Sequence, residues 1–376
     1  MRVRLGDYIK EYSVKNKNNE DIPVYSVSNS LGFCKDYFGK EVASKNKTTY
    51  KIVPRGCFAY NPSRINVGSV DWQNEEERVI VSPLYNVFSV SPLLDQQYLL
   101  YYLKSNVTLS RIRAVASGSV RDNLKLSMLY EFPIDLISLD KQYDVVSTLN
   151  AVQKIIDLYQ KGLSYLDELV RARFVEMFGD PMINPYEWQV INISEVLRAK
   201  ASNGFFSRRD DYCDDGNVKV LGVANVVNRM YSQVVDLPRT NANEKDIEKF
   251  EVKYGDMLFC RSSLVAEGIG KASIIPEGVQ TNILFECHVI RLPLDLDKCV
   301  PEFLQTLSTT KFFRNQIISK SKTATMTTIG QDGILKTNII LPPLEKQKEY
   351  YNFVKQIDKS RLLSNHSLFL IKSLIF

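Results

Sequence analysis

The sequence has few of the side chains from which catalytic and metal sites are usually built. Among 376 residues there are two histidines, His288 and His366, and six cysteines with no Cys-x-x-Cys pair. Zinc-binding spacings are therefore absent, and Ser-His-Asp catalysis has almost no raw material. We expect His288 to be a satisfied core residue within a strand over 284–290. We expect the cysteines to be free and mostly structural, which suits a reducing cytoplasm.

Long apolar runs are also missing. No segment approaches the length of a membrane span, and the N-terminus has no apolar signal region, so we expect a cytoplasmic protein. The net charge is +5 and the pI is near 8.7, which is compatible with a polyanionic partner but does not demonstrate one. A length of 376 residues predicts about two domains with connectors, and a 44% hydrophobic content excludes a disordered chain.

What the sequence does contain is a long apolar seam. Its steps alternate between four and three residues, which is the heptad period of a helix packed lengthwise against another helix. The period predicts a helix from Leu139 to about Phe178, about 60 Å long, that ends at the Gly-Asp-Pro of 179–181. The seam residues are Val145, Leu149, Val152, Ile156, Tyr159, Leu163, Leu166 and Val170.

This helix occurs twice. The sequence Leu-Asp-Lys-Gln at 139–142 returns as Leu-Glu-Lys-Gln at 344–347, and 346 − 141 gives an offset of 205. Two similar helices in one chain predict that each is the other's partner, packed as an antiparallel coiled coil. Two unrelated amphipathic helices are the alternative. The second seam is Tyr350, Val354, Ile357, Arg361, Ser364, Leu368, Ile371 and Ile375.

The segments between the helices also repeat. Strand-like residues at 22–29 and 53–60 have counterparts at 218–225 and 252–259, and a helical stretch at 95–104 has one near 302–307. Loops are expected at 114–123 and 319–330. The expected fold class is α+β, with two tandem similar α/β domains, two long helices between them, and a pseudo-two-fold internal repeat. The predicted boundaries are 1–138 for the first domain, 139–178 for the central helix, 179–188 for a linker, 189–342 for the second domain and 343–376 for the distal helix.

Two motifs hint at enzymes. Asn-Pro at 61–62 and 184–185 resembles the Asn-Pro-x-Tyr/Phe loop with which amino-methyltransferases hold a flipped base. Asn-Pro is also a common turn dipeptide, and no Gly-rich loop for a methyl donor accompanies it. The Gly-Ile-Gly-Lys of 268–271 resembles a phosphate loop, but it lacks the earlier glycine and has Ala272 where Ser or Thr would hold magnesium.

Polar and basic residues gather at corresponding places in both repeats. Arg and Lys neutralise phosphates or read guanine, and Ser, Thr and Asn contact phosphates or base edges. We therefore predict DNA contacts there, although a charged loop is often merely solvated. The predicted residues of the first domain are Tyr60, Asn61, Arg64, Arg111, Arg113, Ser117 and Arg121. Those of the second are Arg261, Ser262, Lys271, Lys320, Lys322, Thr323 and Thr325.

Three motifs resemble those of type I restriction–modification specificity (S) subunits. They are the Phe-Gly-Asp-Pro of 178–181 with Asn-Pro and Trp188 after it, the Pro-Leu-x-x-Gln of 343–347, and the Gly-Asp-hydrophobic strand of 255–259. The first repeat departs from this pattern, since it has Gly56-Cys57-Phe58 in place of Gly-Asp-hydrophobic. The resemblance extends over nearly the whole chain, including its duplication.

The resemblance implies a DNA-reading subunit without catalytic activity. Each target-recognition domain would bind one half of a bipartite asymmetric site in double-stranded DNA. The helices would set the spacing and dock two modification (M) subunits, through which restriction (R) subunits would join. S-adenosylmethionine, ATP and Mg would bind in those partner subunits and no cofactor or metal in this chain. The alternatives are an autonomous adenine-N6 DNA methyltransferase or a fragment of one, which would bind the methyl donor, and a structural scaffold, which would not bind DNA.

Overall fold

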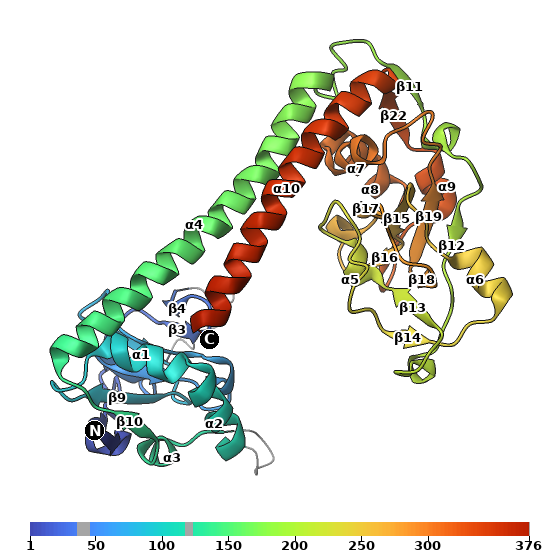
Figure 1. Cartoon of the computed structure of the whole chain (residues 1–376). Coiled ribbons are helices and arrows are strands. Elements are labelled where there is room, and N and C mark those ends of the chain that lie inside the picture. Colours follow the sequence, from blue (N-terminus) through green and yellow to red (C-terminus); the bar gives the residue numbers. More distant parts are fainter. Residues whose placement is uncertain (36–45, 117–122, 376) are drawn as a thin grey trace. The chain divides into compact units, whose positions relative to one another are not determined.

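The computed structural model describes residues 1–35, 46–116 and 123–375 (Figure 1). It divides into two compact units, Met1–Tyr159 with Ser367–Phe376, and Gln160–His366. The division falls inside two long helices, α4 (Leu139–Phe178) and α10 (Leu344–Ile375). Each unit therefore contains one mixed α+β domain and part of both helices. No helix in the described part of the chain is long and apolar enough to cross a membrane.

The first unit is built on a four-stranded antiparallel sheet in the order β2-β9-β6-β7. The pairs β1–β10, β3–β4 and β5–β8 are separate two-stranded ladders. The strands are β1 (Arg2–Arg4), β2 (Ile9–Glu11), β3 (Ser26–Ser28), β4 (Gly32–Cys34), β5 (Lys51–Pro54), β6 (Phe58–Tyr60), β7 (Val70–Trp72), β8 (Arg78–Val81), β9 (Asn86–Val90) and β10 (Pro133–Asp135). The helices are η1 (Leu5–Asp7), η2 (Ile65–Val67), α1 (Gln96–Lys104), α2 (Asn106–Ala116) and α3 (Leu126–Tyr130).

The second unit has a sheet of the same order, β12-β19-β15-β17. A three-stranded sheet β14-β13-β18, the ladder β11–β22 and a small sheet β16-β21-β20 accompany it. The strands are β11 (Gln189–Asn192), β12 (Ser202–Asn203), β13 (Val218–Leu221), β14 (Arg239–Thr240), β15 (Asp256–Cys260), β16 (Ser262–Ser263), β17 (Ala272–Ile274), β18 (Ile283–Phe285), β19 (Val289–Pro293), β20 (Lys322–Thr323), β21 (Thr327–Thr328) and β22 (Asn338–Leu341). The helices are η3 (Ile193–Val196), η4 (Arg209–Asp211), α5 (Val223–Val226), α6 (Glu244–Phe250), η5 (Ala266–Gly268), α7 (Pro301–Thr309), α8 (Lys311–Ser319) and α9 (Gln331–Leu335).

The predicted internal repeat is confirmed. Helices α1, α2 and α3 begin at residues 96, 106 and 126, and α7, α8 and α9 begin at 301, 311 and 331. Each start differs by 205, the offset between the two long helices. In both main sheets a glycine in the left-handed region precedes an inner strand. Gly56, before β6, has φ of 84°, and Gly255, before β15, has φ of 83°. These values are accessible to glycine without strain.

The position after that glycine differs between the repeats. Asp256 is buried and its carboxylate pairs with Arg198 at 2.6 Å and with Arg291 at 3.8 Å. Burial raises the pKa of this carboxyl, and the Lys253 N–H and the two guanidinium groups oppose that rise. Cys57 occupies the place in the first unit and is also buried. A buried thiol needs no counter-ion, so no ion pair is required there.

A buried glutamine fixes the start of each long helix. The Gln142 side chain donates to the carbonyls of Leu93 at 2.9 Å and Ile137 at 2.8 Å, and accepts from the Asp95 N–H at 2.8 Å. The equivalent bonds of Gln347 go to Lys298 at 3.5 Å, Pro342 at 2.8 Å and the Val300 N–H at 2.9 Å. All four positions differ by 205, so the same amide bridge ties α4 to the start of α1 and α10 to the start of α7.

The second unit shows how the long helices pack. Arg361 pairs with Asp167 at 2.6 Å, and Arg173 with Glu349 at 3.2 Å. Residue numbers rise along α4, from 167 to 173, while those of their partners on α10 fall from 361 to 349. The helices are therefore antiparallel in this unit, as predicted. The α7 ring of Phe303 lies 4.9 Å from Phe178 by ring centroids. Phe174 and Tyr350 complete this aromatic cluster, which locks both helices to the domain.

The Phe-Gly-Asp-Pro junction is a helix stop. Gly179 has φ of 75°, and a Cβ there would collide with the Pro185 ring. The Trp188 indole N–H donates to the Phe178 carbonyl at 3.0 Å, which satisfies one of the free acceptors at the end of α4. Asn184 holds both backbone groups of Trp188 with its amide, at 2.8 and 3.0 Å. This Asn-Pro sequence is therefore a structural turn.

The two predicted loops need correction. Helix α2 continues through Ala116, so Ala114 to Ala116 are helical, and residues 117–122 lie outside the described part of the chain. The stretch 319–330 is not a plain loop, because β20 and β21 form a short hairpin within it. Threonine favours strands, but these strands have no alternating apolar residues, so the sequence pattern did not indicate a hairpin.

We expect Gln347→Ala to lower the free energy of unfolding by about 1–3 kcal/mol, because it leaves the Val300 N–H and the Pro342 carbonyl buried without partners. Gln142→Ala should cost a similar amount, since it breaks the equivalent bonds. Gln160→Ala, at an exposed position of α4, is the matched control. Urea denaturation of the full chain measures all three. A loss no larger than that of the control would show that the bridge contributes no net stability.

Candidate nucleic-acid interface

The small sheet β16-β21-β20 brings together predicted residues that are about sixty positions apart in the sequence. Ser262 faces Thr328 and Ser263 faces Thr327, while Lys322 and Thr323 face the same two threonines from the other side. The Ile329 N–H donates to the Arg261 carbonyl at 3.0 Å, which anchors the hairpin to the end of β15. Arg261, Ser262, Lys322, Thr323 and Thr325 therefore belong to one structural element.

This element presents an exposed ammonium, hydroxyl groups and an apolar rim, although the Thr323 hydroxyl is already hydrogen-bonded to that of Thr327 at 3.0 Å. Lys322, Thr323 and Thr325 are exposed, and the Lys322 ammonium has no ion-pair partner among the described residues. Leu264 is 82% exposed and Met326 38% exposed, one at the end of β16 and the other in the turn of the hairpin. A basic β-hairpin with hydroxyl and apolar side chains can contact phosphates, base edges and thymine methyl groups.

His288 was wrongly expected in the core of a strand. The predicted strand over 284–290 is broken, since β18 ends at Phe285 and β19 begins at Val289. His288 occupies the exposed turn between them, and its Nδ1 lies 3.1 Å from the Ser262 Oγ. It thus borders the hairpin element. The apolar residues on both sides, at 283–285 and 289–290, concealed the turn from the sequence pattern.

Two further predicted cations lie beside this element. The Lys271 ammonium donates to Asn228 Oδ1 at 2.7 Å, at the start of β17. The Lys320 ammonium donates to the Lys336 carbonyl at 2.6 Å, at the end of α9, and burial lowers its pKa. Lys320 therefore closes the base of the hairpin, whereas Lys271 remains at the edge of an adjoining cleft.

In the first unit Tyr60 is not available for DNA. Its side chain is fully buried, and its hydroxyl donates to the Leu124 carbonyl at 3.1 Å and accepts from Asn86 at 2.9 Å. The prediction of a contact residue is wrong here, because the aromatic ring fills the core beside Phe88. Burial also raises its pKa.

The other described residues predicted in the first unit lie on α2 or in the turn before η2, two elements that pack against each other. Asn61 Oδ1 accepts from the Ser63 N–H at 3.1 Å, so this Asn-Pro is a turn as well. Arg64 and Arg113 are exposed, while Arg111 lies over the Phe132 ring at 5.7 Å. Arg111 and Arg113 are two residues apart on α2 and therefore point in different directions. Ser117 and Arg121 lie outside the described residues.

The phosphate-loop interpretation of 268–271 finds no support. The N–H groups of Gly268, Ile269 and Gly270 donate to the carbonyls of Val265, Ala266 and Cys260. A phosphate cradle needs such donors free. Within residues 1–35, 46–116 and 123–375, no group of three or more His, Cys, Asp or Glu side chains could hold a metal ion.

A family model described as the type I restriction modification DNA specificity domain matches residues 4–166 and 185–371, which is most of both repeats. The chain belongs to the type I restriction–modification DNA specificity family. It is a specificity subunit of such a system and is non-catalytic, so the resemblance expected from the sequence is confirmed.

Relatives from an archaeon and a bacterium agree with this assignment. The type I restriction enzyme MjaVIII specificity subunit of Methanocaldococcus jannaschii is 22% identical over 378 residues, covering 95% of this chain and 85% of that protein. The EcoKI specificity subunit of Escherichia coli K12 is 20% identical over 377 residues, covering 94% and 79%. A chain from a solved type I R-M system, studied for its complex assembly and conformational transition, has a TM-score of 0.58 at 15% identity and full coverage of this chain. That likeness supports the fold.

Proposed function

We propose that each domain of this specificity subunit reads one half of a bipartite, asymmetric site in double-stranded DNA. The observation that carries this is the repeat itself: two domains with the same sheet order and the same glutamine junction, but with different exposed side chains. A shared scaffold with different surfaces suits two different half-sites. The target-recognition domains would be residues 1–138 and 189–342, joined by the helix of 139–178 and the linker of 179–188.

The long helices would act as spacer and docking site. Among the seam residues, Ile156, Val170, Tyr350 and Val354 are buried, and most of the other described ones are half-buried, whereas Val145 is 38% exposed. The remaining faces are free for two modification subunits, which would carry S-adenosylmethionine and methylate adenine. Restriction subunits using ATP and Mg would join through the assembled complex.

In the second domain the hairpin element would contact the bases. A two-stranded ribbon fits the major groove, where each base pair shows a distinct pattern of donors, acceptors and methyl groups. Lys322 would contact a phosphate or guanine, and Thr323 and Thr325 would contact base edges. In the first domain, Asn61, Arg64 and Arg113 would contact DNA. Ser117 and Arg121, which lie outside the described residues, remain predicted contacts as well.

We expect Lys322→Ala to weaken cognate DNA binding by the full chain. Loss of a phosphate contact would lower the salt slope by about one and weaken all sequences alike, whereas loss of a base contact would cost about 1–3 kcal/mol at one position of one half-site. Lys245→Ala on α6, an exposed lysine outside the hairpin element, is the charge-matched control. Binding equal to that of the parent at matched salt would remove the hairpin from the interface.

The spacer role predicts that shorter helices will read a shorter gap. Deleting Tyr159–Tyr165 together with Ser364–Leu370 removes one heptad from each helix, at equivalent positions and close to the boundary between the two units. The cut leaves the seam in register and spares Asp167, Arg361 and both glutamine junctions. It shortens each helix by about 10 Å, or about three base pairs.

Sequencing of methylated adenines in a host that carries the shortened chain and its modification partners measures the gap. The two half-sites should be unchanged and the unread gap between them shorter. Methylation of the parent site by a folded, active complex, with the parent gap, would show that the helices do not set the spacing.

A further inference from the structure

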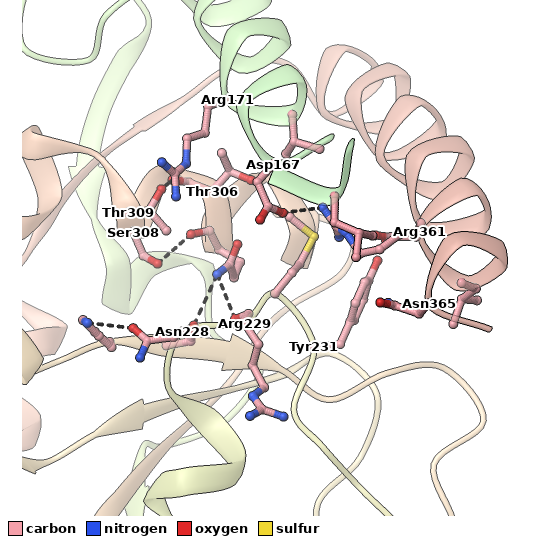
Figure 2. A pocket seen from close by; sticks show the side chains of 18 of the residues that line it. Asp167, Arg171, Asn228, Arg229, Tyr231, Thr306, Ser308, Thr309, Arg361 and Asn365 are labelled. Carbon is pink, nitrogen blue, oxygen red and sulfur yellow. Dashed lines mark hydrogen bonds and ion pairs between the residues drawn. The ribbon is translucent and has the colours of Figure 1, made fainter. Parts of the chain in front are cut away.

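A cleft of about 800 Å³ lies within the second unit, where the long helices meet the domain (Figure 2). Asp167 and Arg171 of α4 and Arg361 and Asn365 of α10 form one wall. The opposite wall comes from the loop of 228–231, from the start of β17 and from the ends of α7 and α8. Its lining therefore comes from several separate segments of the chain.

The charges in this cleft do not balance. The two carboxylates that line the cleft, Asp167 and Asp358, both pair with Arg361, each at 2.6 Å. The other cations have no carboxylate partner within the described part of the chain. They are Arg171, Arg229, Lys271 and Arg314.

Three of these four cations donate hydrogen bonds to neutral acceptors, and the fourth, Arg171, has no partner among the described residues. The Arg229 guanidinium donates to Gln233 at 2.9 Å and to two carbonyls, and Lys271 donates to Asn228. Arg314 donates to the Ile269 carbonyl at 2.6 Å, while its Nη1 is buried without an acceptor among the described residues. The exposed Arg171 side chain makes no hydrogen bond or ion pair to any described residue. Four uncompensated cations in one hollow favour an anionic ligand.

The corresponding hollow in the first unit is apolar. It is lined by Tyr98, Tyr101, Tyr102, Ser105, Val145, Leu149, Gln153 and Ile156. At the offset of 205, Ile156 stands where Arg361 does, and Gln153 where Asp358 does. Leu109 stands at the position of Arg314. The junction between helix and domain can thus form without these charges, so packing alone does not require them in the second unit.

The cleft also adjoins the hairpin element. The Cys260 N–H donates to the Lys271 carbonyl at 2.9 Å, and the next residue, Arg261, begins the segment that carries β16. Lys271, just before β17, is therefore paired with the end of β15, which leads into the hairpin element. A nucleotide is the less favoured ligand, because the nearby N–H groups of Gly268 to Gly270 are already occupied by carbonyls.

We propose that this cleft binds the phosphate backbone of duplex DNA, independently of base sequence, beside the half-site read by the second domain. The proposal rests on the proposed DNA-reading function and adds a second, non-specific contact to it. The contact is asymmetric, since the equivalent hollow of the first unit is lined by tyrosines and aliphatic side chains and by no cation. Arg171 and Lys271, at the accessible edge, would make the phosphate contacts.

The test compares the parent full chain with the double variant Arg171→Gln/Lys271→Gln on non-cognate and cognate duplexes, by fluorescence anisotropy between about 50 and 200 mM salt. Each lost phosphate contact should lower the slope of log affinity against log salt by about 0.9, so the double variant should lose nearly two units. Near 0.15 M salt this corresponds to a weakening of roughly five-fold per contact. Lys245→Gln on α6 is the charge-matched control, and its slope should differ from that of the parent by less than the loss of one phosphate contact.

Specificity separates this proposal from the function on which it rests. The double variant should keep the parent ratio of cognate to non-cognate affinity, and in the assembled complex it should keep the parent methylation motif. If the parent itself shows no sequence preference while the slope still falls, the reading proposal fails and the cleft proposal stands. An unchanged slope in a variant with the parent melting temperature overturns the cleft proposal. So does a changed motif, or saturable binding of ATP by the parent that the variant loses.

Discussion

The glutamine bridge at the start of each long helix is the contact on which the architecture depends. A helix that begins at Leu139 or Leu344 could leave its domain at many angles, but the buried amide fixes three backbone groups at once. Because Gln142 and Gln347 make equivalent bonds at equivalent positions, the two repeats join their helices in the same way. The aromatic cluster around Phe303 then adds a second attachment in the second unit.

Each repeat combines a shared scaffold with residues of its own. The core sheets and the helix junctions are shared, while the residues that follow β6 and β15 are not. Asn61 and Arg64 follow β6, and Arg261 and Leu264 follow β15. The junction hollows differ as well, with tyrosines in one unit and cations in the other. A duplicated scaffold can therefore present two unlike surfaces to DNA, which is the physical requirement for reading an asymmetric site.

Sequence alone predicts the parts of this molecule that have a period. The heptad seam and the offset of 205 located both long helices and the repeat, because such signals are spread over many residues. Features with no period were missed: the threonine hairpin after Ser319, the turn that exposes His288, and the burial of Tyr60. The basic cleft could not be predicted, since its cations come from separate segments that only the fold brings together. The roles of Arg64, Arg113 and Lys322 in DNA binding remain predictions.

The central claim is that one chain reads two unlike half-sites across an unread gap. Long-read sequencing of methylated adenines, in a host that carries only this chain with its modification partners, tests it most directly. We expect a single motif with two specified blocks of different sequence, separated by a fixed number of unspecified base pairs. A contiguous motif, or two identical inverted blocks, would contradict it.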